Sequence, residues 1–238
     1  MSQREPSVTV EPTLDAYRFY EAEWGEYDEL VEAFEWEIPE QFNAATYVCD
    51  RWAESESDRV ALVAIGSGGS DIEYTFEQLQ AHANRLANYL TDQGVERGDR
   101  IAVSGAQRIE CLTTLVAAWK LGAIAVPLSI RFGPDALGYR LTDSGASAIV
   151  ADRTSLPALR EVADDCEALE TVLTVGASET QGDEVQFETA IDGQVSTFDT
   201  ATTDAEAPAT IMYTSGTTGP PRALFIPTDR SSGCYPHT

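Results

Sequence analysis

The feature that most constrains this chain is a regular alternation of short apolar runs and helix-forming segments, at a step of about 24 residues. The runs predicted to be strands are DRIAVSG (99–105), AIAVPL (123–128), SAIVAD (147–152) and TVLTVG (171–176). Helices are predicted between them at 108–121, from Pro134 to Gly145, and at 156–166. This spacing fits right-handed crossovers, and near-continuous apolar strands are typical of sheets covered on both faces. The pattern predicts an α/β fold with a largely parallel sheet flanked by helices.

The segment before this alternation predicts a hairpin followed by a helix. VALVAIG (60–66) and IEYTF (72–76) are two short apolar runs around three glycines, which is typical of a β-hairpin. Thr75 and Gln78 then form a capping box, and the helix that they begin is expected to end at Gly94.

The charge of the chain excludes one class of partner. Forty acidic residues face 15 basic ones, which gives a net charge of −25, and Lys120 is the only lysine. A nucleic-acid-binding protein needs a basic surface to face the phosphates, so no nucleic-acid partner is predicted. Because salt screens self-repulsion, the excess of carboxylates indicates a cytoplasm of high salt concentration. An acidic face that binds a partner is the alternative interpretation.

Neither a membrane span nor a metal site is predicted. The most apolar stretch, 112–128, is interrupted by Lys120, Gly122 and Pro127, so helix, turn and strand describe it better than a membrane helix. The four cysteines lie far apart in the sequence and form no CxxC pair, which argues against zinc and a disulfide framework. No apolar signal segment precedes residue 14, and a cytoplasmic protein with reduced thiols is expected.

The loop after the last apolar run has the composition of a phosphate-binding loop. A predicted strand, ATIMYT (209–214), leads into it, and the candidate site comprises Thr214, Ser215, Gly216, Thr217, Thr218, Gly219, Pro220, Pro221 and Arg222. Glycines allow several N–H groups to point into one concavity, while hydroxyls and a guanidinium add donors. The spacing differs from a Walker A loop, since no lysine follows the second glycine, which argues against a P-loop kinase or ATP hydrolase. An ordinary surface loop is the alternative.

The order of residues in this loop resembles a known family. The string Tyr-Thr-Ser-Gly-Thr-Thr-Gly-x-Pro-[Lys/Arg] is similar to the phosphate loop of the acyl-adenylate-forming, or AMP-binding, superfamily, and the likeness covers about residues 30–222. Upstream segments in the same order also resemble it: FNAATYVCDRWA, TFEQLQAHANRLANYL, GVERGDRIAV, AAWKLGAIAVPL and FGPDALGYRLTDSGA. The first and last of these are most similar to acetyl- and medium-chain acyl-CoA synthetases.

The resemblance implies a two-step ligase reaction. A carboxylate attacks the α-phosphate of ATP to give an acyl-adenylate and diphosphate, and the thiol of coenzyme A then releases AMP as acyl-CoA forms. The implied substrates are a small carboxylic acid, ATP with Mg²⁺, and coenzyme A, as in fatty acid metabolism. In the family this loop holds the β- and γ-phosphates. Arg222 stands where the family usually has lysine, and Ala223 stands where it usually has glycine.

The resemblance also implies that this chain is an incomplete N-terminal domain of an adenylate-forming enzyme. The expected organisation is a disordered N-terminus (1–13), a partial AMP-binding domain (14–222) and an atypical tail (223–238), which we hypothesise to be out of frame. The family's catalytic lysine and ribose-binding acid lie beyond the loop, so no catalytic residue is identified here. The expected function is that of an N-terminal fragment of an AMP-forming acyl-CoA synthetase. A non-catalytic nucleotide-binding remnant is the alternative.

Overall fold

The computed structural model describes residues 26–28, 31, 39–65, 71–214, 222–227 and 235–236. The chain divides into two units, Met1–Glu40 and Gln41–Thr238. In the first unit, residues 27, 28 and 31 are helical. The disorder predicted for residues 1–13 lies outside the described residues. All that follows concerns the second unit.

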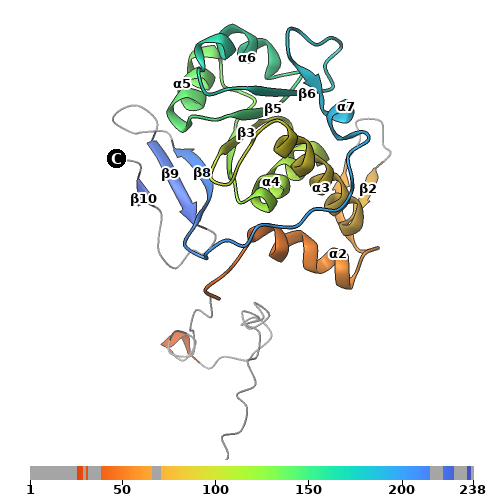
Figure 1. The fold of residues 1–238 in the computed structure, drawn as a ribbon. Coiled ribbons are helices and arrows are strands. Elements are labelled where there is room, and N and C mark those ends of the chain that lie inside the picture. Colours follow the sequence, from red (N-terminus) through yellow and green to blue (C-terminus); the bar gives the residue numbers. More distant parts are fainter. Residues whose placement is uncertain are drawn as a thin grey trace, which may run out of the picture. The chain divides into compact units, whose positions relative to one another are not determined.

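A mixed sheet forms the centre of the second unit (Figure 1). Within the described residues it contains eight strands. Across the sheet they run β10 (Tyr235–Pro236), β9 (Arg222–Pro227), β8 (Pro208–Thr214), β4 (Ile124–Leu128), β3 (Arg100–Ser104), β5 (Ala148–Asp152), β6 (Thr171–Val175) and β7 (Val185–Gln186). The pairings from β8 to β7 are parallel, whereas β9 and β10 are antiparallel to their neighbours. The predicted α/β class with a largely parallel sheet is confirmed.

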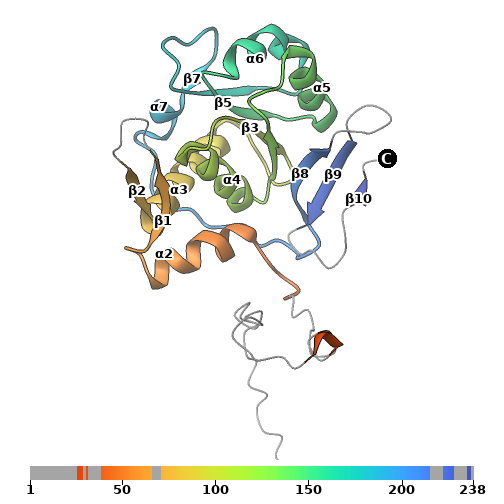
Figure 2. The same ribbon diagram turned by 180° about the vertical axis from the view of Figure 1, so that it is seen from behind.

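The order of the strands places helices on both faces. The chain runs from β3 to β4 on one side and then returns past β3 to β5, so right-handed crossovers put the first connecting helix and the later ones on opposite faces. Helix α4 (Ile109–Leu121) packs with α3 (Phe76–Asp92), and α5 (Pro134–Ser144) packs with α6 (Leu156–Val162). Figures 1 and 2 show these two pairs on either side of the strands.

Two apolar cores follow from this layering. Alternate residues of β3 point to opposite faces, so Ile101 and Val103 enter the core under α3 and α4, while Ala102 enters the core under α5 and α6. Helix α4 is buried on more than its apolar face. Its polar residues Thr113 and Lys120 are only 0% and 1% exposed. The sheet covers α4 on one side and α3 on another.

The helix ends confirm the sequence signals. Thr75 caps α3 through the predicted box, in which its hydroxyl accepts from the Gln78 N–H and the Gln78 side chain accepts from the Thr75 N–H. Helix α5 begins at Pro134 and is closed by Gly145 in the left-handed conformation. The last predicted helix is shorter than expected, because α6 gives way to a 3-10 turn at Ala163–Asp165.

Shorter elements complete the fold. Strands β1 (Val60–Ala64) and β2 (Ile72–Thr75) pair antiparallel, as predicted. A π-helical turn at Thr46–Asp50 leads into α2 (Arg51–Ser55), and α7 (Phe187–Ile191) lies in the polar stretch before β8. Strand β7 was not expected from the sequence.

An extended segment, residues 193–207, connects α7 with β8; we call it the strap. It passes over α3 and α4 and lies beside residues 41–50 (Figure 1). Because it has little regular secondary structure, its backbone groups are bonded both by side chains of the elements beneath it and by backbone groups of residues 42 and 120.

Candidate functional site

The candidate phosphate loop connects two antiparallel strands. Thr214 ends β8, Arg222 begins β9, and these two residues are cross-strand partners in the last pair of the ladder. Both side chains are exposed. The structure therefore brings the first and last predicted site residues together, while residues 215–221 lie outside the described residues.

The position of Thr214 in the sheet suits a ligand site. Strand β8 runs parallel to β4, so Thr214 lies at the edge of the sheet where the carboxyl ends of the parallel strands gather. In open α/β sheets ligands bind outside this edge. The loop between Thr214 and Arg222 thus begins and ends at the edge that this fold class uses for binding.

Tyr213, the residue before Thr214, contacts α5 in several ways. Its hydroxyl lies 2.8 Å from the carboxylate Oδ2 of Asp143 and 3.2 Å from the carbonyl oxygen of Arg140. The guanidinium carbon of Arg140 lies 5.3 Å from the centre of the Tyr213 ring and 3.9 Å from that of Phe132. Burial, followed by the hydrogen bond to Asp143, raises the pKa of Tyr213 above its ordinary value. Sequence reasoning missed these contacts, because no pattern in the sequence pairs β8 with α5.

The residue after Arg222 has a structural role. Ala223 is 5% exposed and belongs to the core under α5 and α6, together with Ile211 of β8. Its methyl group therefore fills apolar space, and the strand tolerates a side chain where the family usually has glycine.

The carboxyl ends of β3 and β5 are closed by Asp152. This buried carboxylate accepts hydrogen bonds from the N–H groups of Ala106, Thr154 and Ser155. The Ser155 hydroxyl in turn bonds that of Ser104 at 2.9 Å. The donors at this part of the edge are satisfied internally, so Asp152 acts as a structural acceptor.

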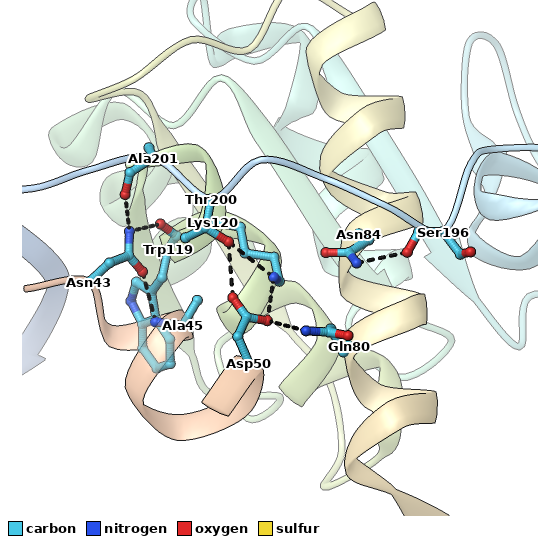
Figure 3. Close-up of polar contacts among 10 residues, drawn as sticks. All are labelled: Asn43, Ala45, Asp50, Gln80, Asn84, Trp119, Lys120, Ser196, Thr200 and Ala201. Atoms are coloured by element: carbon cyan, nitrogen blue, oxygen red, sulfur yellow. Dashed lines mark hydrogen bonds and ion pairs between the residues drawn. The ribbon is translucent and has the colours of Figure 1, made fainter. Parts of the chain in front are cut away.

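A buried ionic network lies under the strap (Figure 3). The Lys120 ammonium donates to Asp50 Oδ1 at 2.5 Å and to the Thr200 hydroxyl at 3.1 Å. Thr200 donates to Asp50 Oδ2 at 3.0 Å, and the Gln80 amide donates to Asp50 Oδ1 at 2.9 Å. The only lysine of the chain is therefore a buried structural cation that joins α4, α3, the turn before α2 and the strap. Its one sequence signal was its position inside the most apolar stretch.

Asn43 lies beside this network and connects α4 with the strap (Figure 3). Its amide donates to the carbonyl oxygens of Trp119 at 2.8 Å and Ala201 at 2.9 Å, and its oxygen accepts from the Ala45 N–H at 2.8 Å. All three amide hydrogen bonds are to backbone atoms, so Asn43 fixes the course of the strap without offering groups to a ligand.

Other chemistries find no support in the described residues. No group of three or more His, Cys, Asp or Glu side chains there is arranged to hold a metal ion. No helix in the described ranges is long and apolar enough to cross a membrane. His82 of α3 is partly buried, and burial, followed by Arg85, lowers its pKa below the ordinary value, as in a packed histidine.

The fold, the carboxyl-edge loop and the sequence around it define the class of this protein. A family model described as AMP-binding enzyme matches residues 49–231, and the chain belongs to this family. The match includes β8, the loop and β9. The family resemblance inferred from the sequence is confirmed.

The relatives that match most of the chain include acyl- and acetyl-CoA synthetases. The chain is 29% identical over 225 residues to the mitochondrial acyl-coenzyme A synthetase ACSM4 of Rattus norvegicus, which covers 92% of this chain and 37% of that protein. It is 28% identical over 207 residues to the acetyl-coenzyme A synthetase of Chromobacterium violaceum, covering 80% of this chain and 32% of that protein. The crystal structure of Brucella canis acyl-CoA synthetase superposes with a TM-score of 0.76 and 28% identity, over 86% of this chain and 38% of that one. The chain thus spans about a third of the length of the curated relatives it matches.

Proposed function

We propose that this chain is the phosphate-binding portion of an AMP-forming acyl-CoA synthetase, which joins a carboxylate to coenzyme A at the expense of ATP. The observation that carries the proposal is the β8–β9 hairpin. It places Thr214 and Arg222 side by side at the carboxyl edge of the sheet, within the segment that matches the AMP-binding family. The names of the relatives support an acyl or acetyl group as the transferred unit.

The loop would serve as an electrostatic cradle for the leaving diphosphate. Backbone N–H groups around Gly216 and Gly219, the hydroxyls of the loop and the Arg222 guanidinium are donors suited to phosphate oxygens. Arginine presents a planar fork of donors, so it binds two phosphate oxygens at once where lysine offers a point charge. Fixed donors stabilise the charge that develops as diphosphate leaves.

The described residues do not supply a metal site of their own. Mg²⁺ keeps octahedral oxygen coordination and commonly binds through substrate phosphates, so it would reach the site on ATP. There it would share the phosphate charge. The chain's own part is to orient the β- and γ-phosphates, and the Asp152 carboxylate at the end of β5 is already bonded to three backbone N–H groups.

The test combines binding with chemistry. Isothermal titration of the chain with Mg·ATP and with Mg·diphosphate, in concentrated KCl, measures the phosphate site directly. Exchange of labelled diphosphate into ATP that depends on acetate or a medium-chain acid measures adenylation. Binding with exchange establishes the synthetase half-reaction, and binding without exchange supports a nucleotide-binding role alone. Absence of any binding by the folded chain would contradict the proposal.

A further inference from the structure

Beyond Thr210, β8 has ladder pairs with β9 but none with β4 among the described residues. Among the described residues, the parallel ladder between β4 and β8 contains a single pair, Ala125 with Thr210. The ladder between β8 and β9, by contrast, continues to Thr214 and Arg222. Paired backbone groups on the β4 side do not fix these last residues, so contacts with the helix packed on this face contribute to holding them.

Helix α5 supplies that attachment through Tyr213. The phenol hydroxyl bonds the Asp143 carboxylate and the Arg140 carbonyl oxygen, which lie on one turn of the helix. The Arg140 side chain curls over Tyr213 and Phe132, and its Nη1 donates to the Ala136 carbonyl oxygen at 2.7 Å. One turn of α5 thus contacts the ring, the hydroxyl and the strand end together.

Arg140 is a buried cation, which is unusual for a residue whose side chain only fills space in the core. It is 6% exposed, its Nε lacks a hydrogen-bond partner, and it forms no ion pair with any carboxylate of the described residues. Burying a cation without a paired anion is costly, and aromatic faces compensate only part of that cost. The guanidinium therefore leaves positive charge beneath the strand that leads into the phosphate loop.

We propose that Tyr213, Arg140 and Asp143 form a clamp that fixes the end of β8 and so positions the phosphate loop. The inference rests on the proposed function for its consequence in binding, but the clamp itself is a property of the folded chain. The three residues are positioning residues: they act through Thr214 and Arg222, which end and begin the two strands that carry the loop.

Hydrogen exchange measured by mass spectrometry tests the clamp without a ligand. In Tyr213→Phe we expect amides of 209–214 and 222–226 to exchange about three- to tenfold faster, because net hydrogen bonds of this kind change an opening equilibrium by about that factor. Amides of β3 should be unaffected. Tyr89 is a partly buried tyrosine on α3, so Tyr89→Phe is the matched control. It should leave amide exchange in β8 and β9 unchanged.

A conservative pair of variants separates positioning from general stability. Asp143→Asn retains an oxygen that can accept from Tyr213, so it should keep near-normal exchange. Asp143→Ala should accelerate exchange in the same residues as Tyr213→Phe but to a smaller extent, because the Arg140 carbonyl oxygen remains as an acceptor. Equal exchange in wild type, Tyr213→Phe and Asp143→Ala would overturn the clamp. So would a uniform acceleration across β3 and the hairpin, since that pattern reports global destabilisation.

The same variants are titrated with Mg·diphosphate. We expect Tyr213→Phe to bind about three- to tenfold more weakly, Asp143→Ala to lose less affinity, and Asp143→Asn to stay close to wild type. If wild type binds and all variants bind equally, the positioning role is wrong while the proposed function stands. If wild type does not bind but exchange at the hairpin responds as expected, the clamp stands and the proposed function fails.

Discussion

The ammonium of Lys120 donates a hydrogen bond to the carboxylate of Asp50 at 2.5 Å, in a site where the Lys120 side chain is 1% exposed. This contact joins residues 70 positions apart in the sequence. Thr200 of the strap bonds both partners, so the pair also holds the strap against α4. The chain places its single lysine at this buried junction, although its sequence has 40 acidic residues against 15 basic ones.

Removing either charge of this pair should destabilise the fold strongly. We expect Lys120→Met or Asp50→Leu to lower the free energy of unfolding by about 3–5 kcal/mol, because each leaves the other charge buried and unpaired. The double variant should recover much of that loss, since no charge is then buried. Urea denaturation in constant KCl measures all three variants. As the control, Glu56→Gln removes the charge of the exposed pair with Arg59, leaves Arg59 over the Trp52 ring, and should cost less than about 1 kcal/mol.

The strap should also be sensitive to crowding at Gly122. This glycine has a φ of 70°, and a Cβ there would meet the Arg97 side chain at 3.2 Å, Ala201 at 3.3 Å and Thr203 at 3.4 Å. Gly122→Ala should therefore cost more than the roughly 1–2 kcal/mol expected for the left-handed backbone alone. Gly94→Ala is the matched control, because its φ is 88° but no atom lies within 4 Å of the added methyl group. Equal thermal stability of the two variants would refute a packed strap at this position.

The thiol of Cys49 should make the protein sensitive to alkaline pH. Burial, with a further contribution from Asp50, raises the pKa of Cys49 from 9.0 to about 12. The folded state then holds this proton at pH values where the unfolded state has lost it, so stability is full below about pH 9 and falls as the pH rises toward 12. The unfolding free energy of Cys49→Ala should fall less steeply over this window than that of wild type. Identical slopes would show that the thiol does not contribute.

The charge of −25 predicts that salt stabilises the fold. Carboxylates repel one another over a Debye length of about 10 Å at 0.1 M salt and about 3 Å at 1 M. We expect the melting temperature to rise by several degrees between 0.1 and 1 M KCl, with roughly 2–4 °C for each kcal/mol gained in a chain of this size. Sucrose of equal osmolality is the control, because it does not screen charge. An equal rise in sucrose would assign the effect to solvent exclusion.

We expect Arg222 to supply the positive charge that binds the phosphate oxygens at this site. Arg222→Gln is expected to weaken Mg·diphosphate binding by about tenfold, the effect of losing a charge-assisted contact of roughly 1.5 kcal/mol. Arg222→Lys should bind more weakly than wild type but better than Gln, because it retains charge and loses the planar fork. Arg59→Gln removes one positive charge from an exposed position just before β1 and should bind like wild type. Equal affinities for all four proteins would exclude Arg222 from the site.

Local patterns in the sequence were enough to predict most elements. The Thr75 capping box, the Pro134 start and Gly145 end of α5, and the apolar runs of the parallel strands are decided by neighbours in the chain. Strand β9 shows a limit of that reasoning. All of its residues after Arg222 lie in the segment expected to be atypical, yet they pair with β8 along the ladder. The origin proposed for residues 223–238 stays a prediction, although the family match continues to residue 231.

The sequence by itself determined the α/β class, the family and the residues of the candidate loop. The spacing of apolar residues, the residues that begin and end helices, and the order of residues in a motif are all local properties of the chain. Which strands are neighbours, and therefore that Thr214 lies at the carboxyl edge, was decided by the tertiary structure. So were the partners of Lys120 and Tyr213. A lysine in an apolar stretch requires a counter-charge and a buried phenol requires an acceptor, but only packing brings Asp50 and Asp143 within reach.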